Sequence, residues 1–127
     1  MIIPCYNLEN VVRTTVKNIL KNLEKYTNSF EILIVNDGST DNTLKVIQEI
    51  KNNHKLIHVI TYPQNKGKGY AVKTGILQSI GSSIVFIDGD LDITSDAIQN
   101  YINELDNFDL VIGSKSSQNS EIEIRQS

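Results

Sequence analysis

Residues 84–92, IVFIDGDLD, join a short apolar run to three aspartates spaced two apart. Residues 32–39, ILIVNDGS, show the same change from an apolar run to a polar turn. Short continuous runs rich in β-branched residues are typical of strands buried on both faces of a parallel sheet. Both stretches therefore predict strands of an α/β fold, each ending in a polar turn.

Other stretches complete this pattern. Residues 1–3, 57–60 and 110–112 predict further strands, the first of them only the end of a strand. Between the runs, four sets of apolar residues recur at helical spacing, each predicting one buried stripe: Val12, Val16, Ile19, Leu20 and Leu23; Leu44, Ile47 and Ile50; Val72, Ile76, Leu77 and Ile80; Ile98, Tyr101, Ile102 and Leu105. With right-handed crossovers, the alternation predicts a three-layer α/β/α fold with an open, mostly parallel sheet.

Size and composition set the class of protein. The 127 residues predict one domain, spanning 1–115, followed by a polar loop or tail at 116–127 without a helix or strand pattern. A net charge of −3 and the absence of a long basic block argue against a nucleic-acid partner. The single Cys5, the lack of a membrane-length apolar run and the lack of a signal-peptide pattern predict a cytoplasmic chain. Contact with the cytoplasmic face of a membrane is expected only through regions outside this chain.

Polar turns follow every predicted strand. They cover residues 4–7, 36–41, 65–69, 88–92 and 113–115. Ligands of open α/β sheets bind at the carboxyl ends of the strands, so these turns are expected to converge on one crevice.

Asp88, Asp90 and Asp92 form the sharpest local feature. Carboxylates two residues apart in an extended segment point the same way and repel one another unless a cation offsets their charge. Mg²⁺ or Mn²⁺ suits such oxygen ligands. Alternatively, the aspartates belong to a solvated turn that caps the following helix.

Three further positions have both a functional and a structural interpretation. Asp37 is suited to accept a hydrogen bond from a nucleotide base, or it belongs to an ordinary turn. Lys66 and its neighbour Lys68 offer ammonium groups at a helix start, suited to phosphate, or form a solvated basic turn. Tyr6 stacks on a base or packs at the rim.

Five motifs in order resemble the dolichyl-phosphate mannosyltransferase-like branch of the family-two glycosyltransferases. They are Ile3-Pro4-Cys5-Tyr6-Asn7, Ile34 to Asp41, Asn65-Lys66-Gly67-Lys68-Gly69, Asp88-Gly89-Asp90 and Val111 to Lys115. The resemblance covers nearly the whole chain and corresponds to the nucleotide-sugar-binding part of a GT-A fold. It implies that the fold is truncated at its C-terminus.

The resemblance also implies roles for individual residues. It places Pro4, Tyr6, Val35 and Asp37 around the base and ribose; Asp88, Gly89 and Asp90 at the ribose and diphosphate; Asp90 and Asp92, with Asp88, at the metal; and Lys115 near the donor phosphates. Relatives often place a Glu directly after Tyr-Asn, whereas here Leu8 precedes Glu9, the residue assigned to the donor. Asn36 and Asp92 also depart from the family pattern.

The implied reaction is an inverting, metal-dependent transfer of a hexose from a GDP- or UDP-sugar, with Mg²⁺ or Mn²⁺, to a polyprenyl or dolichyl phosphate. No general base is identified in the sequence, and the chain alone is expected to turn over little. The alternative is a non-catalytic nucleotide-binding or interaction domain of the same α/β build. A sugar-phosphate nucleotidyltransferase is disfavoured because its glycine-rich N-terminal loop is not seen.

Overall fold

The computed structural model of the chain describes residues 1–90, 95–107, 111–112 and 123–124. These residues belong to two compact units, Met1–Asp92 and Ile93–Ser127. Within the described residues, the first unit contains three strands and three helices, and the second contains one helix and two short strands.

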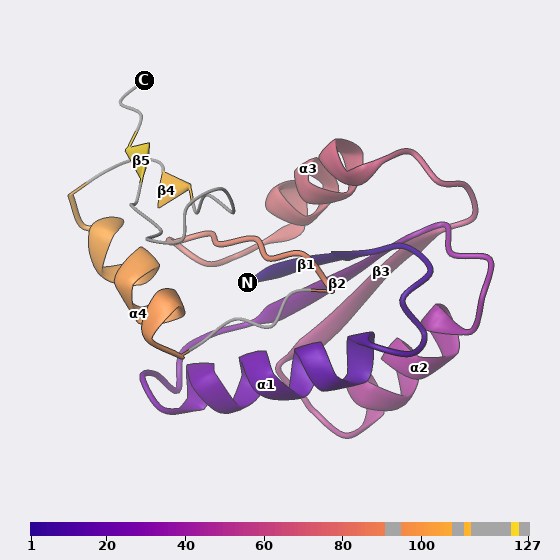
Figure 1. The fold of residues 1–127 in the computed structure, drawn as a ribbon, viewed down its shortest axis with the longest axis horizontal. Coiled ribbons are helices and arrows are strands. Elements are labelled where there is room, and N and C mark those ends of the chain that lie inside the picture. Colours follow the sequence, from indigo (N-terminus) through magenta and orange to yellow (C-terminus); the bar gives the residue numbers. More distant parts are fainter. Residues whose placement is uncertain (91–94, 108–110, 113–122, 125–127) are drawn as a thin grey trace. The chain divides into compact units, whose positions relative to one another are not determined.

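A parallel sheet forms the centre of the first unit. Its strands lie in the order β1-β2-β3, and their bounds are β1 (Ile2–Cys5), β2 (Ile32–Asp37) and β3 (Ile57–Tyr62). Helices α1 (Val12–Glu24) and α2 (Thr43–Asn52) cover one face, and α3 (Lys68–Gln78) covers the other (Figure 1). All six residues of β2 are buried because layers lie on both of its faces. The predicted three-layer α/β/α arrangement is confirmed.

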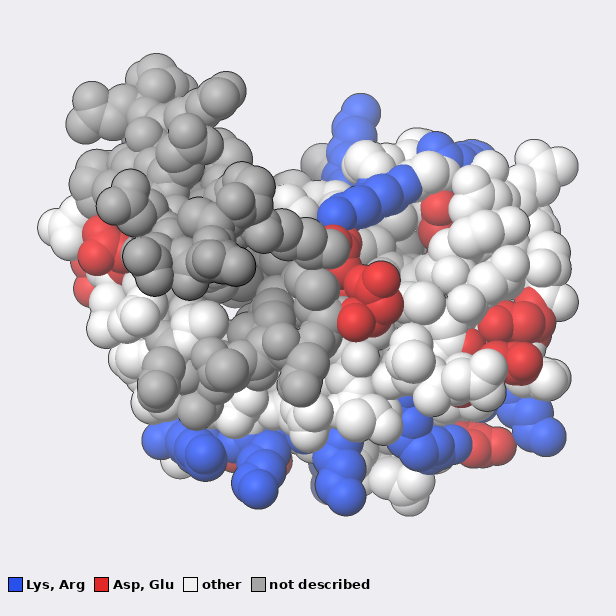
Figure 2. Space-filling model, in the orientation of Figure 1, with Lys and Arg blue, Asp and Glu red and all other residues white. Residues whose placement is uncertain are grey.

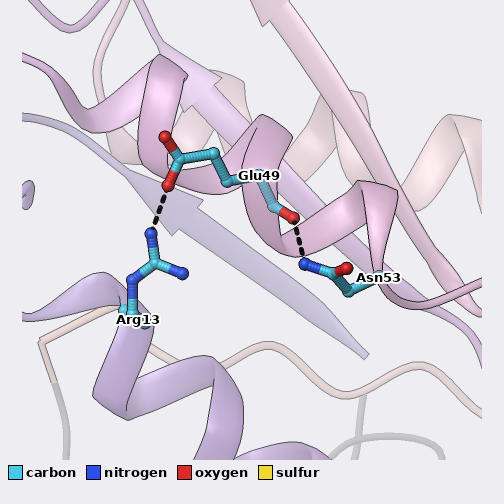
Figure 3. Close-up of polar contacts among 3 residues, drawn as sticks. All are labelled: Arg13, Glu49 and Asn53. Atoms are coloured by element: carbon cyan, nitrogen blue, oxygen red, sulfur yellow. Dashed lines mark hydrogen bonds and ion pairs between the residues drawn. The ribbon is translucent and has the colours of Figure 1, made fainter.

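Helix α1 has the stripe that the sequence predicts. Its five predicted apolar positions are buried, and Thr15 is buried with them. On the exposed side, the guanidinium of Arg13 lies 2.5 Å from Glu49 Oε2 on α2 (Figure 3). The side chain of Asn53 donates a 3.0 Å hydrogen bond to the Glu49 carbonyl at the end of α2. The ion pair is half-exposed, so it orients the two helices more than it stabilises them.

Helix α3 packs differently from the prediction. Its buried residues are Ala71 and Gly75, whereas Leu77 and Ile80 are 75% and 89% exposed. A Cβ at Gly75 would lie 2.6 Å from Ile2 Cγ2, which shows how closely this helix approaches β1. The expected stripe of Val72, Ile76, Leu77 and Ile80 is therefore wrong, because contact through small residues turns the larger ones away from the sheet.

The predicted strand at 84–87 is present only as an isolated parallel bridge between Ile2 and Phe86. The N–H of Ile2 donates to Val85 O at 2.7 Å, and the N–H of Ile87 donates to Ile2 O at 2.9 Å. The next bond of such a ladder would need an N–H from Pro4, which proline lacks. Pro4 thus limits the pairing, and the expectation of a full strand buried on both faces is wrong.

In the second unit, α4 (Ser95–Glu104) buries Ile98 completely. Strand β4 (Val111–Ile112) pairs antiparallel with β5 (Glu123–Ile124) in a separate two-stranded sheet. The expectation of a fifth parallel strand is therefore wrong, because a short apolar run does not specify its partner. Strand β5 lies where the sequence predicts neither helix nor strand. In the described part of the chain, no helix is long and apolar enough to cross a membrane.

The close approach of α3 to β1 predicts opposite effects of two alanine substitutions. Gly75→Ala forces a methyl group against the stiff, buried Ile2 side chain and should lower the free energy of unfolding by about 1–3 kcal/mol. Gly69→Ala, in the same helix, meets nothing within 4 Å and should be neutral or stabilising by up to about 1 kcal/mol. Urea denaturation of both variants measures the difference. Equal effects would contradict the packing described for α3.

Candidate functional site

A cavity of about 370 Å³ lies in the first unit, where β1 and β2 end and α3 begins. Its lining comes from turns that are far apart in the sequence. The residues are Pro4, Cys5, Tyr6, Leu8, Asp37, Asn65, Gly67, Lys68, Ala71, Asp88, Gly89 and Asp90. Polar turns after parallel strands therefore do converge here, as expected for an open α/β sheet.

The turn after β1 is fastened to the turn after β2. Asn7, at φ 51°, accepts a 2.8 Å hydrogen bond from the Thr40 N–H through Oδ1. Its own N–H donates to Ser39 Oγ at 3.0 Å. The Glu9 carboxylate accepts the Asn42 N–H at 2.8 Å. This network of hydrogen bonds holds Tyr6, which is 45% exposed, at the cavity rim.

Asp41 belongs to the same hydrogen-bond network, at the start of α2. Its Oδ1 accepts hydrogen bonds from the N–H and the hydroxyl of Thr43, at 2.9 and 2.5 Å. Burial alone would raise the pKa of Asp41, but the hydrogen bonds from Thr43 and from the Glu9 N–H lower it below its ordinary value. Asp41 thus acts as a charged anchor for two turns.

Asp37 anchors the loop that precedes α3. The side chain is only 3% exposed, and its carboxylate accepts hydrogen bonds from the Lys66 N–H at 2.8 Å and the Gly67 N–H at 2.9 Å. The amide of Asn65 adds a third at 3.1 Å. A carboxylate offers about four acceptor positions, so one is left beside these three hydrogen bonds.

Gly38 allows the same loop to lie against the end of β2. Its φ is +64°, and a Cβ at this position would lie 2.4 Å from the backbone N of Asn65. Both the left-handed conformation and the backbone contact require glycine.

Lys66 and Lys68 point to different surroundings. The ammonium of Lys66 lies 4.5 Å from the ring centroid of Tyr70 and 5.8 Å from that of Tyr62. The two rings meet edge to face at 5.4 Å. Burial, and then the nearby carboxylate of Asp37, raises the pKa of Tyr62 well above its usual value, although no hydrogen bond of acceptable geometry joins the two. The ammonium of Lys66 therefore makes cation–π contacts with Tyr62 and Tyr70.

Lys68, the first residue of α3, instead forms an ion pair with Asp88 in the cavity lining. Its ammonium also lies 5.9 Å from the ring of Phe86. The Asp88 side chain is 21% exposed and that of Lys68 is 55% exposed. The pair thus combines a partly buried carboxylate with an ammonium that has room to turn toward an anion.

Gly89 and Cys5 shape the floor of the cavity. A Cβ at Gly89 would lie 2.8 Å from Leu8 Cδ1 and 2.9 Å from Cys5 Sγ, so only glycine fits without movement. Burial, followed by the charge of Asp90, raises the pKa of the Cys5 thiol to about 12. Cys5 is therefore an uncharged packing residue at neutral pH, and it carries no nucleophilic chemistry.

Three carboxylates line the cavity, and they differ in how their charge is compensated. Asp37 is compensated by N–H groups and Asp88 by Lys68. Asp90 is exposed, and among the described residues it has no hydrogen bond or ion pair. It is thus the carboxylate best placed to meet a cation from solution.

The family model of glycosyl transferase family 2 matches residues 1–126. The chain belongs to glycosyl transferase family 2. An uncharacterized glycosyltransferase of Synechocystis is 28% identical over 127 residues, which is 99% of this chain and 40% of that protein. A dolichyl-phosphate β-glucosyltransferase of Saccharomyces cerevisiae is 40% identical over 96 residues, 71% of this chain and 29% of that protein. The chain thus spans well under half the length of these relatives.

Solved structures show the same fold. Mannosyltransferase PcManGT of Pyrobaculum calidifontis, in complex with GDP-Man and Mn²⁺, aligns with a TM-score of 0.72 at 24% identity, over 82% of this chain and 31% of that one. TarS 1–349 of S. aureus, in complex with UDP-GlcNAc, aligns with a TM-score of 0.60 at 24% identity, over 91% of this chain and 35% of that one. The expected GT-A fold is confirmed.

For this family-two chain, the structure brings together six of the ten residues predicted to bind the donor. Pro4, Tyr6, Asp37, Asp88, Gly89 and Asp90 line the cavity. Three do not line it: Val35 is buried in β2, Glu9 accepts a hydrogen bond at the start of α2, and Lys66 lies on the tyrosines. Lys115 lies outside the described residues, as does Asp92 of the predicted metal ligands.

The metal prediction stays open on this geometry. Within the described residues, no group of three His, Cys, Asp or Glu side chains is arranged to hold an ion. Asp88 and Asp90 lie in one cavity lining, while the third predicted ligand is outside the described part of the chain.

The sequence analysis assigns Lys66 to the donor, whereas the structure places Lys68 in the cavity lining. Two lysines flank Gly67 and look equivalent in the sequence. Only the helix start at Lys68 and the aromatic pair beside Lys66 separate them. A lysine at the first position of a helix that follows a glycine is the signal that was available.

The anchoring role of Asp37 predicts a large loss of stability on Asp37→Ala. Two main-chain N–H groups of the 66–67 segment lose their acceptor, so the free energy of unfolding should fall by about 2–5 kcal/mol. Asn65→Ala keeps both of these bonds and should cost only about 1 kcal/mol. Chemical denaturation ranks the two variants, and a milder effect for Asp37→Ala than for Asn65→Ala would rule out this anchor.

Proposed function

We propose that this chain forms the donor-binding part of a transferase that moves a hexose from a GDP- or UDP-sugar to a polyprenyl or dolichyl phosphate. The observation that carries the proposal is the cavity in which Asp90 lies exposed beside the Lys68–Asp88 pair. Membership of glycosyl transferase family 2 and likeness to a dolichyl-phosphate β-glucosyltransferase support the reaction and the lipid acceptor.

The base and ribose occupy the side of the cavity formed by Pro4, Tyr6 and Asp37. Tyr6 is exposed at the rim and offers a ring face for stacking. The remaining acceptor position of Asp37 is suited to a base N–H. Gly89 carries no side chain, so the ribose and diphosphate can approach the backbone there.

The diphosphate carries negative charge into a cavity that already contains three carboxylates. Lys68 turns from Asp88 toward a phosphate oxygen, because its ammonium is half-exposed and pairs with a single carboxylate among the described residues. Asp88 and Asp90 would hold Mg²⁺ or Mn²⁺, since hard divalent cations prefer carboxylate oxygens, and Asp92 is proposed to complete the set. When bound, such a cation offsets the charge that develops on the departing nucleoside diphosphate.

The transfer is a direct displacement that inverts the anomeric carbon. An oxygen of the acceptor forms the new bond to the anomeric carbon while the bond between this carbon and the diphosphate oxygen breaks. A lipid phosphate is already ionised at neutral pH, so its oxygen attacks without a general base. Transfer to a lipid phosphate therefore needs no general base from the described residues.

The donor-binding domain of the proposed transferase spans residues 1–115. The protein acts in the cytoplasm, at the cytoplasmic face of the membrane that holds the acceptor.

Donor binding is expected to depend on a divalent cation. Calorimetric titration of the chain with GDP-mannose or UDP-glucose should give binding with Mn²⁺ that weakens at least tenfold without it, on the order of the loss caused by perturbing a metal site. Asp90→Asn should remove this dependence, because it removes the exposed carboxylate. Glu24→Gln makes the same charge change on the exposed side of α1 and should bind like the parent. Binding that is equally strong without Mn²⁺ would favour a non-catalytic nucleotide-binding domain.

The two neighbouring lysines should differ in their effect on the donor. Lys68→Gln is expected to weaken binding of GDP or UDP by roughly tenfold, the value of one charge-assisted hydrogen bond. Lys66→Gln should change it less than about threefold, because its ammonium lies on Tyr62 and Tyr70. Equal losses in the same titration would contradict the assignment of the phosphate contact to Lys68.

A further inference from the structure

Helices α1 and α2 expose a basic face on the first unit. It consists of Arg13, Lys17, Lys21, Lys25, Lys45 and Lys51, all of them exposed. Figure 2 shows blue side chains along the lower edge of the view, where Figure 1 places α1 and α2. The two helices carry five basic and two acidic side chains, although the whole chain has a net charge of −3. The positive surface is therefore a local feature.

The basic residues of α1 follow the period of the helix. Arg13, Lys17, Lys21 and Lys25 are four residues apart, and so they lie along one side of the helix, away from the buried stripe. Like charges at this spacing destabilise a helix slightly. The stripe thus has no benefit for the stability of α1 itself.

Most of this charge is not compensated within the described residues. Arg13 is paired with Glu49, the acidic residue of α2. Within that part of the chain, Lys17, Lys21 and Lys45 have no ion pair. The face therefore presents ammonium groups to whatever lies in solution.

We propose that the basic face docks on the surface of an anionic lipid bilayer. Clusters of four to eight Lys and Arg on an amphipathic helix attract anionic headgroups. The face is built from lysine, with its one arginine engaged by Glu49, and lysine acts as a point charge suited to diffuse attraction. Val11 and Tyr26, each 41% exposed, flank α1 and add side chains that tolerate the interface between lipid and water.

A bilayer is favoured over a nucleic acid. Specific contacts to bases and phosphates rely on arginine forks and on exposed aromatic platforms. No unpaired arginine lies on the basic face, and neither α1 nor α2 contains an aromatic residue. The cavity residues lie at the ends of β1 and β2, on the turns that follow the strands and on α3, outside the basic face, so docking leaves the donor site accessible.

Vesicle flotation at low salt tests the docking surface. The probe is a vesicle of phosphatidylcholine with about a third phosphatidylserine, compared with phosphatidylcholine alone. Each lysine contributes about fivefold, so Lys17→Gln with Lys21→Gln should weaken binding by roughly 25-fold. Lys73→Glu changes the net charge by the same amount on α3, at the other face of the sheet, and should change binding less than about threefold.

Several outcomes would overturn the proposal. These are equal binding to both vesicles, equal loss in both variants, or binding to a DNA duplex with none to vesicles. Nucleotide-sugar titration of the same variants separates this result from the fate of the donor site. If the double variant loses vesicles but keeps the donor, docking is supported whether or not transfer is observed.

Discussion

The buried carboxylate of Asp37 is the constraint on which the rest of the cavity depends. A charge removed from water is costly unless hydrogen bonds replace the lost solvation, and here main-chain N–H groups at 2.8 and 2.9 Å provide them. These bonds fix residues 65–67 against the end of β2. They thereby fix where α3 begins, and with it the position of Lys68 and the contact of Gly75 with Ile2.

Hydrogen bonds between distant segments join the parts of the chain that line the cavity. The turn after β1 is bonded to the turn after β2 through Asn7 and through the Glu9 N–H, which donates to Asp41. The loop before α3 is bonded to β2 through Asp37. Each link joins segments at least about 25 residues apart in the chain, so local propensity alone cannot produce it. A preformed site loses less conformational entropy when a ligand binds.

The sequence predicts the parts of this fold that depend on local pattern. The runs at 32–35 and 57–60 and the stripe of α1 are recognisable because burial on both faces or on one side leaves a periodic trace. The run at 84–87 misled because its pairing depends on Pro4, a residue of another strand. Helix α3 misled because its contact with β1 uses Ala71 and Gly75, whose small size leaves no hydrophobic signal.

At the site, too, the sequence predicts which residue types matter but not where each side chain points. Asp37, Asp88 and Asp90 could be selected because carboxylates directly beside a short apolar run are unusual. The choice between Lys66 and Lys68 could not be made, since it depends on which ammonium meets Tyr62 and Tyr70 and which meets Asp88. Glu9 was chosen from a family position, but its carboxylate serves the start of α2.

The positive charges of the first unit act over two different distances. The basic face acts at long range and Lys68 acts at contact distance, and neither can replace the other. The lysines of the basic face act through water, where salt screens them within about 10 Å, so they suit attraction to an extended surface. Lys68 acts at contact distance beside Asp88, in a partly buried cavity where screening is weaker. The positive field on α1 and α2 therefore does not offset the charge of the carboxylates that line the cavity. Asp90, the carboxylate that has no compensating partner among the described residues, lies in the lining of this cavity.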